Sequence, residues 1–451
     1  MPNMNPKRTM MHIENPDIRK TNFNIIYHGY TEQEAIDEAN RCLHCPIPKC
    51  KESCPIKNNI PEFINEIKNK DYKKAYSFIQ EKSILSDICG TICPHEDQCE
   101  GHCVRGLRGE SVNIGALERF VSEWANKNIK EVNPIKNKYK VACIGSGPAS
   151  ITFALYLARK GYNVTIYEKE SYVGGVLSWG IPSYRLGKEI LDNYISRLKV
   201  LGVNFVFNYK VGSSHPLEEI IKNYDATFIG TGALNSNKMH IPGEDLKGVY
   251  PADEFLSKIN LSNDKSSNNY GSKILVVGGG NVAMDASRDA IRLKQVSRVD
   301  IVYRRSENEM PACTEELNMA KEEGVIFNTL TNPVKFIGEN GVLKKVECAI
   351  MELGEPDSSG RRRPIESTKP HIFFDVDSAV LALGFSNDKE IGETTANLNI
   401  DKYGCFIVDE NNMTSLKNVY AGGDAVTGAK TVVLAMKAGL NAAKDVEKKF
   451  K

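Results

Sequence analysis

The chain has 451 residues, 41% of them hydrophobic, and its 58 basic and 57 acidic side chains leave a net charge of +1. This length predicts two or three domains. The balanced charge argues against nucleic acid or a membrane surface as the main partner. The sequence has no apolar run that could span a bilayer and no signal-peptide pattern at its start, so we expect a cytoplasmic protein.

The first 130 residues are predicted to form helices and loops around eight of the 12 cysteines. Thr31 and Glu34 give a capping-box pattern at the start of a helical stripe that ends at Cys42. Residues 60–81 also have apolar side chains at helical spacing. The eight cysteines lie in two segments, "CLHCPIPKCKESCP" with Cys42, Cys45, Cys50 and Cys54, and "CGTICPHEDQCEGHC" with Cys89, Cys93, Cys99 and Cys103.

Clustered cysteines in a reducing compartment indicate metal or redox chemistry rather than disulfides. Two zinc sites of four thiolates each are one interpretation. Zinc sites usually have CxxC pairs, however, and only Cys42 and Cys45 form one. Cys54 is followed by Pro55, which is the ending of a ferredoxin-like cysteine pattern. The pattern therefore favours iron–sulfur clusters and leaves zinc as the alternative.

Residues 139–168 are predicted to form a strand, a glycine turn, a helix and a second strand. The turn "GSGPAS" contains Gly145 and Gly147, with Ser150 where a third glycine is usual. Such a turn lets a dinucleotide pyrophosphate approach the N-terminus of the helix. Glu168 ends the second strand, where a carboxylate can accept hydrogen bonds from ribose hydroxyls. This unit is predicted to bind a dinucleotide.

The same pattern recurs at residues 272–305, which indicates an internal duplication. Its turn "GGGNVA" contains Gly278, Gly280 and Ala283. Arg304 aligns with Glu168 of the first unit, and Arg305 follows it. Guanidinium groups bind a 2′-phosphate that a carboxylate would repel, so this unit is predicted to prefer NADP(H) over NAD(H). A further basic run, "GRRRP" at residues 360–364, is interpreted as an exposed loop.

Three further segments resemble FAD-dependent pyridine nucleotide oxidoreductases. They are "YVGG" with Gly174 and Gly175, "DATFIGTGA", and "VYAGGDAVTGAKTV". The resemblance implies that Asp424 contacts the ribityl–phosphate part of FAD. It also implies that the helix starting near Thr431 directs its N-terminus at the flavin ring.

Over essentially the whole chain, these motifs together with "GIPSYRL", "YRRSENEMPA" and "GEPDSSGRRRP" are similar to the small subunit of bacterial glutamate synthase. They are also similar to the large subunit of NADH-dependent ferredoxin:NADP oxidoreductase and to the N-terminal half of dihydropyrimidine dehydrogenase. The resemblance implies two [4Fe–4S] clusters with crossed ligation and leaves Cys89 as a non-ligand. One cluster would take Cys42, Cys45, Cys50 and Cys103, and the other Cys54, Cys93, Cys99 and Glu118.

The predicted fold class is α/β, with a helical iron–sulfur domain followed by two Rossmann-like dinucleotide-binding domains. The predicted domains are residues 1–130 for the two clusters, residues 138–245 plus 375–451 for FAD, and residues 246–374 for NADP(H). The predicted cofactor-binding residues are Gly145, Gly147, Pro148, Ala149, Glu168, Gly175, Arg185, Gly232, Gly423, Asp424, Thr431 and Val432 in the FAD part, and Gly278, Gly280, Asn281, Val282, Ala283, Arg304, Arg305 and Gly384 in the NADP(H) part.

The expected function is electron transfer between NADPH, FAD, the clusters and a partner. No catalytic side chain is assigned, because the flavin carries the chemistry. The partner would be a larger or flavin-containing subunit, or a second copy of the chain. Two alternatives remain open: the large subunit of an electron-bifurcating ferredoxin:NADP oxidoreductase, and a non-catalytic metal-binding redox sensor.

Overall fold

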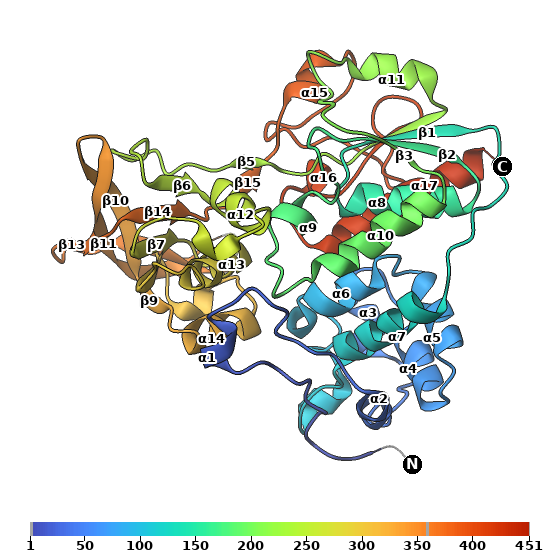
Figure 1. Ribbon diagram of the computed structural model, residues 1–451, viewed down its shortest axis with the longest axis horizontal. Helices are drawn as coiled ribbons and strands as arrows, with labels where there is room; N and C mark the ends of the chain where they lie inside the picture. The colour runs from blue at the N-terminus through green and yellow to red at the C-terminus, as the bar shows by residue number, and fades with distance from the viewer. Residues whose placement is uncertain (1–2, 358–359, 451) are drawn as a thin grey trace.

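The computed structural model describes residues 3–357 and 360–450. Its helical N-terminal part lies beside two parallel β-sheets, and each sheet has helices packed on it (Figure 1). No helix of the described residues combines the length and apolarity that crossing a membrane requires. The three parts follow the predicted α/β class.

The N-terminal helical part has a core of its own, which includes Phe63, Ile64 and Leu117. The predicted capping box is present, since the backbone N–H of Thr31 donates to the Glu34 carboxylate at 2.8 Å. Residues 60–81 form two helices rather than one, because Lys70 has a φ of +59° and the Asp71 side chain caps the second helix. The helices are α1 (Pro16–Arg19), α2 (Glu32–Ala39), α3 (Lys49–Glu52), α4 (Ile60–Lys68), α5 (Tyr72–Gln80), α6 (Ser86–Ile92) and α7 (Ile114–Asn128).

The first sheet has the strand order β16-β4-β1-β2-β3, and all its pairs are parallel. Strands β1, β4 and β16 are buried apolar segments, as a sheet covered by helices requires, whereas β2 and β3 are only partly buried. The last strand and helix come from the C-terminus, so this unit is discontinuous. Its elements are β1 (Lys140–Ile144), α8 (Pro148–Arg159), β2 (Asn163–Tyr167), α9 (Val176–Trp179), α10 (Lys188–Val200), β3 (Asn204–Val206), α11 (Leu217–Asn223), β4 (Ala226–Ile229), α15 (Glu390–Thr394), β16 (Val419–Ala421), α16 (Asp424–Thr427) and α17 (Val432–Lys449).

The second sheet repeats this plan with the order β6-β14-β7-β8-β9, again all parallel. A return to the FAD part at residue 375 was expected, but β14 pairs with β6 and β7, so the chain crosses back only after Leu381. The other predicted domain limits stay predictions. The elements are β6 (Val249–Pro251), α12 (Ala252–Asn260), β7 (Lys273–Val277), α13 (Asn281–Ile291), β8 (Arg298–Tyr303), α14 (Thr314–Glu322), β9 (Ile326–Thr329) and β14 (Ser378–Leu381).

An antiparallel sheet extends from the second unit, on the side away from the first sheet (Figure 1). The "GRRRP" run was expected to be an exposed loop, but Arg362 begins strand β12, which pairs with β11. A two-stranded ribbon of β5 (Asn235–Ser236) and β15 (Phe385–Ser386) connects the two units. The antiparallel strands are β10 (Thr331–Glu339), β11 (Val342–Pro356), β12 (Arg362–Glu366) and β13 (Ile372–Asp375).

Candidate functional site

Four of the cysteines surround one cavity in the helical part. Cys42 follows α2, Cys45 and Cys50 flank the start of α3, and Cys103 precedes a short 3₁₀ turn. Burial, together with the neighbouring Cys103 and Cys42, raises the pKa of the Cys50 thiol to about 12. The structure thus brings together the four residues expected around one cluster, although they come from both cysteine segments.

A second group forms around Cys54, Cys93, Cys99 and Glu118. Burial, and to a lesser extent Glu118 and Cys89, raise the pKa of Cys54 to about 11. Burial also raises the pKa of Cys99 well above its usual value, and Glu100, Cys54 and Glu118 add to the effect. These influences show that the thiols and the carboxylate are close neighbours. Bound cationic iron would stabilise their charged forms, as metal binding does for thiolates in general.

Glu118 contributes to this group a buried carboxylate with one oxygen unpaired in the described part of the chain. It lies on α7, is 7% exposed, and its Oε1 atom has no hydrogen-bond partner among the described residues. Burial raises the pKa of its carboxyl group to about 7, although Ser83 and Asn58 beside the carboxylate lower it. A buried carboxylate oxygen without a donor is unfavourable unless a cation binds it. The residues present therefore fit an iron site at this position, and the ligand assignment itself stays a prediction.

Neither group is arranged as a single-ion site. In residues 3–357 and 360–450, no three His, Cys, Asp or Glu side chains lie close enough together to bind one metal ion. Zinc would require four ligands at about 2.0–2.3 Å from one centre. The first four thiols instead line a cavity. A cavity lined by four thiols is a setting in which four thiolates could surround a polynuclear iron–sulfur cluster.

Cys89, the predicted non-ligand, belongs to a different hydrophobic core from Cys42, Cys50 and Cys103 of the first group. It is 3% exposed and belongs to the hydrophobic core that α6 shares with the first sheet unit. It still lies next to Cys93, whose pKa is raised well above its usual value, first through a hydrogen bond with Cys89 and then by burial. Because Cys89 adjoins Cys93 and is predicted not to bind iron, it is the matched control for Glu118.

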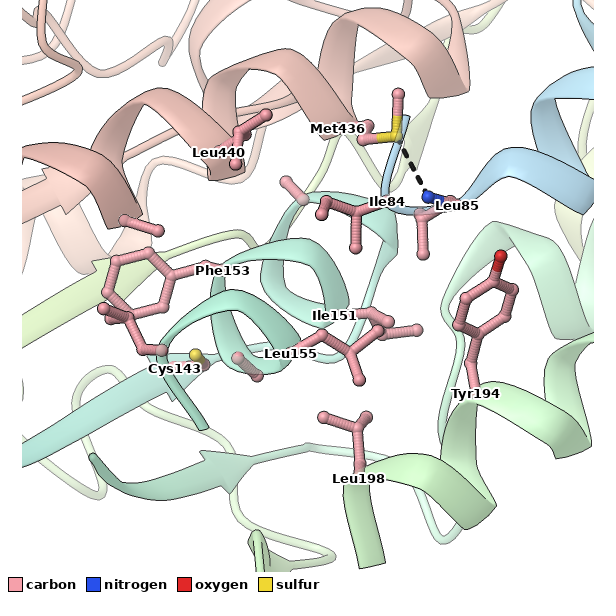
Figure 2. Close-up of a cluster of buried hydrophobic side chains, with 14 of the residues drawn as sticks. Ile84, Leu85, Cys143, Ile151, Phe153, Leu155, Tyr194, Leu198, Met436 and Leu440 are labelled. Atoms are coloured by element: carbon pink, nitrogen blue, oxygen red, sulfur yellow. Dashed lines mark hydrogen bonds between the residues drawn. The ribbon is translucent and has the colours of Figure 1, made fainter. Parts of the chain in front are cut away.

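Helix α6 connects the second cysteine group to the first sheet unit. Ile84 and Leu85 pack between α8 and α17, and the Leu85 N–H donates to the Met436 sulfur at 3.2 Å (Figure 2). Tyr194 of α10 donates its hydroxyl proton to Asp87. Leu85 is one helical turn from Cys89, and Met436 is about one turn from the start of α17. One turn is about 5.4 Å, so the contact between Leu85 and Met436 places the start of α6, the helix that leads into Cys93, on the first turns of α17.

The glycine turn of the first unit meets α8 as predicted. Gly145 has a φ of +87°, and a Cβ atom there would lie 2.7 Å from the backbone oxygen of Gly230. At Gly147 the same oxygen would be 3.8 Å from an added Cβ, so the protein leaves this side open. The Glu168 carboxylate accepts hydrogen bonds from the backbone N–H groups of Ser146 and Glu170, both at 2.9 Å. The turn, the helix N-terminus and the carboxylate meet at one edge of the sheet, in the arrangement typical of a dinucleotide site.

The C-terminal part of the chain completes this edge. Gly423 has a φ of +69° at the start of α16, followed by Asp424. Burial raises the pKa of Asp424, and its Oδ1 accepts from the Lys430 N–H at 3.1 Å. Thr431 precedes α17, and its buried hydroxyl has no hydrogen-bond partner in the described part of the chain. An unpaired polar atom at a helix N-terminus fits a polar ligand such as the flavin ring.

The second unit repeats the steric pattern of the first. A Cβ atom at Gly278 would lie 2.4 Å from the backbone oxygen of Ala382, whereas at Gly280 the nearest atom, in Pro311, would be 3.8 Å away. In both units the first glycine is needed by the protein itself and the second leaves room for a ligand. This correspondence supports the predicted duplication.

This contrast predicts different defects for the two glycines of the first unit. Gly147→Ala is expected to weaken FAD binding by about 1–3 kcal/mol, because its methyl group would occupy ligand space, with little change in apoprotein melting temperature. Gly145→Ala is expected to lower that melting temperature through the clash with Gly230. Flavin-release titration and calorimetry of the apoprotein test both. Equal melting losses for the two variants would contradict this division of roles.

The predicted basic residues of the second unit have different surroundings. Arg304 is exposed, and in the described part of the chain no hydrogen bond or ion pair engages it. Arg305 is 5% exposed, and its Nη2 atom pairs with Asp357 at 2.7 Å. Arg304 is therefore the guanidinium available to a ligand, while Arg305 is engaged by the protein.

Arg185 is likewise engaged by the protein. Its guanidinium pairs with Asp285 of α13 at 2.6 Å and with Glu316 of α14 at 2.8 Å. Arg185 is 9% exposed and lies in the first unit, so this ion pair joins the two units. These partners do not support a direct contact between Arg185 and a cofactor. The sequence alone did not indicate Asp285 and Glu316 as the partners of Arg185.

The remaining predicted residues lie at the same two edges. Gly174 and Gly175, with φ of +120° and +54°, precede α9, and the Gly174 N–H donates to the Ser146 hydroxyl at 3.0 Å. Gly232 and Gly384, with φ of +74° and +84°, follow β4 and β14. The residues that begin the three helices at these edges are Pro148 and Ala149 in α8, Asn281, Val282 and Ala283 in α13, and Val432 in α17.

Two family models match the chain. Residues 19–130 match dihydropyrimidine dehydrogenase domain II, 4Fe-4S cluster, and residues 139–439 match pyridine nucleotide-disulphide oxidoreductase. The matched stretches coincide with the cysteine-rich helical part and with the two sheet units. The helical part therefore resembles a known 4Fe–4S domain, as the sequence predicted.

Several curated proteins are similar over most of the chain. The small chain of NADPH glutamate synthase from Escherichia coli is 32% identical, over 94% of this chain and 93% of that protein. The beta subunit of an NADP(+)-dependent formate dehydrogenase from Moorella thermoacetica is 37% identical over 88% of this chain. The chain spans 59% of the length of that formate dehydrogenase subunit.

Solved structures share the fold at lower identity. Mycobacterium tuberculosis FprA in complex with NADPH matches with a TM-score of 0.59 and 19% identity, over 69% of this chain and 84% of that one. Thioredoxin reductase from T. acidophilum matches with a TM-score of 0.52 and 17% identity, over 69% and 98% of the two chains. At these identities the likeness establishes the arrangement of the two sheet units alone.

Proposed function

Since the chain belongs to the pyridine nucleotide-disulphide oxidoreductase family and to its branch of glutamate synthase small chains and related beta subunits, we propose that it transfers electrons from NADPH to a partner subunit. It is an NADPH-linked oxidoreductase of the type that uses FAD and 4Fe–4S centres. Two clusters, rather than one, are part of the proposal.

One observation supports this function most strongly. Helix α6 carries Cys89 and leads into Cys93, and it is docked on α17 through Leu85 and Met436 (Figure 2). The same helix α17 has the unpaired Thr431 hydroxyl at its start. The helix that leads into Cys93 therefore packs directly on the helix whose N-terminus is proposed to face the flavin. Such proximity is what electron transfer between two cofactors needs.

The bound groups supply the chemistry: FAD accepts a hydride and releases electrons singly, and 4Fe–4S clusters accept them. The chain supplies binding and orientation. Gly147 and the N-terminus of α8 would bind the FAD pyrophosphate, and Gly280 with α13 would bind that of NADPH. Seven cysteines and Glu118 would bind the two clusters. The N-terminus of α17 would stabilise negative charge on the flavin.

The partner is proposed to be a larger or flavin-containing subunit, with a homo-oligomer as the alternative. Relatives named as the glutamate synthase small chain and as beta subunits of formate dehydrogenase and NADPH-Fe(3+) oxidoreductase motivate this. Purification of the tagged chain from its native host tests it, because the possible partners differ greatly in size. A cytoplasmic location stays a prediction.

Nicotinamide preference is expected to depend on Arg304. Arg304→Glu should weaken NADPH binding by roughly 1.5–3 kcal/mol, the contribution of a hydrogen bond to a charged group, and should weaken NADH binding far less. Steady-state kinetics with both nucleotides measure the two effects. Equal losses for NADPH and NADH would mean that Arg304 does not contact the 2′-phosphate.

A further inference from the structure

The "GRRRP" run lies next to the end of β8, far from it in sequence. Strand β11 pairs with β12 in a register that puts Arg362 opposite Pro356. This hairpin brings the backbone of Arg362 within hydrogen-bond distance of Arg305, the second residue after β8. Two separate basic segments therefore meet at the carboxyl end of a parallel strand, which is the edge where this fold binds nucleotides.

Arg305 fastens the hairpin in this place. Its Nε atom donates to the backbone oxygen of Arg362 at 2.8 Å, and its Nη2 atom pairs with Asp357 at 2.7 Å. Both donors are directed at the hairpin, and the side chain is only 6% exposed. The charge of Arg305 is balanced by Asp357. Arg305 is therefore a positioning residue for the hairpin.

Arg362 brings a second guanidinium to the same edge. Its Nε atom donates to Glu309 at 2.8 Å, while its side chain keeps 48% of its surface exposed. Glu309 also accepts a hydrogen bond from the Ser306 hydroxyl. That bond, and then Arg362, lower the pKa of Glu309, so it is an anion at neutral pH. An uncompensated carboxylate here would oppose the binding of a phosphate.

We propose that Arg362 and Arg304 together bind the 2′-phosphate of NADP(H), with Arg305 positioning the hairpin that carries Arg362. This deepens the proposed function and rests on it. A phosphate monoester carries between one and two negative charges. Without Arg362, the charge of Arg304 would be cancelled by Glu309. With Arg362 the edge is net positive, and two exposed guanidinium groups are present for charge-assisted hydrogen bonds.

Binding of adenosine 2′,5′-bisphosphate and of AMP to the full-length holoprotein, measured by calorimetry, tests this proposal. Arg362→Met is expected to weaken the bisphosphate roughly tenfold or more, as for a lost charge-assisted hydrogen bond, and to leave AMP within about twofold. Arg363→Met is the matched control. Arg363 is exposed and adjacent, but successive strand residues point to opposite faces.

A second variant separates direct contact from charge balance. Glu309→Gln in the Arg362→Met background is expected to recover part of the lost affinity for the bisphosphate, because the repelling carboxylate is gone. If the wild-type protein binds the two nucleotides equally, the proposed NADPH preference itself fails. If the wild type discriminates, but Arg362→Met behaves like Arg363→Met, then the role of Arg362 is wrong and the NADPH preference stands.

Discussion

Replacing Glu118 by alanine is expected to remove one iron–sulfur cluster and leave the other intact, with loss of about half of the iron. Glu118 is buried among Cys54, Cys93 and Cys99, and its Oε1 atom has no hydrogen-bond partner in the described residues. The other four cysteines line a separate cavity, so their cluster should persist. Iron analysis and low-temperature EPR after anaerobic purification measure the effect.

Cys89→Ser is the matched control for Glu118→Ala. Cys89 is buried, more so than Cys54 and Cys93, and adjoins Cys93, but it belongs to the apolar core shared with α8 and α17. Serine there should preserve both clusters and cost only packing stability. Glu118→Cys should keep the cluster with an altered potential, because thiolate is a softer ligand than carboxylate. Cluster loss in Cys89→Ser together with no effect of Glu118→Ala would overturn the ligand assignment.

Glu323→Gln is expected to destabilise the second sheet unit by about 3–5 kcal/mol, as when one partner of a buried ion pair is removed. The Glu323 carboxylate is fully buried and pairs with Arg288 at 2.8 Å, Arg292 at 2.7 Å and Arg19 at 2.9 Å. Arg19 comes from α1, so the same carboxylate attaches the N-terminal segment to this unit. Differential scanning calorimetry of the holoprotein measures the loss.

The neighbouring Glu322→Gln serves as the control. Its carboxylate also pairs with Arg19, at 2.6 Å, but its side chain is 54% exposed. Exposed ion pairs contribute only about 0–1 kcal/mol, so this variant should melt nearly like the wild type. Similar melting temperatures for the two variants would show that the buried network contributes no more than a surface pair.

The same carboxylate predicts a dependence on pH. Burial alone would raise the pKa of Glu323, but hydrogen bonds from Arg292 and Arg288 outweigh it and lower the pKa to about 2, from a usual value of 4.5. A depressed pKa means that the stabilisation is complete above pH 4.5 and is lost as the pH falls toward 2. Glu323→Gln should therefore show a shallower loss of stability in this acidic range than the wild type.

Local patterns in the sequence were sufficient to predict much of the fold. The turns at Gly145 and Gly278 are each preceded by a buried strand and followed by a helix, and both are found as expected. The capping box at Thr31 and the closing helix after Thr431 are also confirmed. These features depend on backbone conformation and on short spacings, which a single sequence displays directly.

Contacts between distant segments could not be predicted in this way. Arg185 resembled a cofactor residue, but its partners Asp285 and Glu316 are visible only in the folded chain. Strand β14 was assigned to the wrong part because an apolar strand fits either sheet equally well. The "GRRRP" run resembled a solvated loop until the pairing of β11 with β12 placed Arg362 beside Arg305.

The central claim is that one chain connects NADPH to iron–sulfur clusters through FAD. Anaerobic titration of the purified protein with NADPH, followed by absorbance and EPR and with iron, zinc and flavin quantified, tests it most directly. We predict one FAD and about eight irons per chain, bleaching of the flavin by NADPH, and an EPR signal from at least one reduced cluster. Stoichiometric zinc with little iron, or a flavin that stays oxidised in excess NADPH, would contradict the claim.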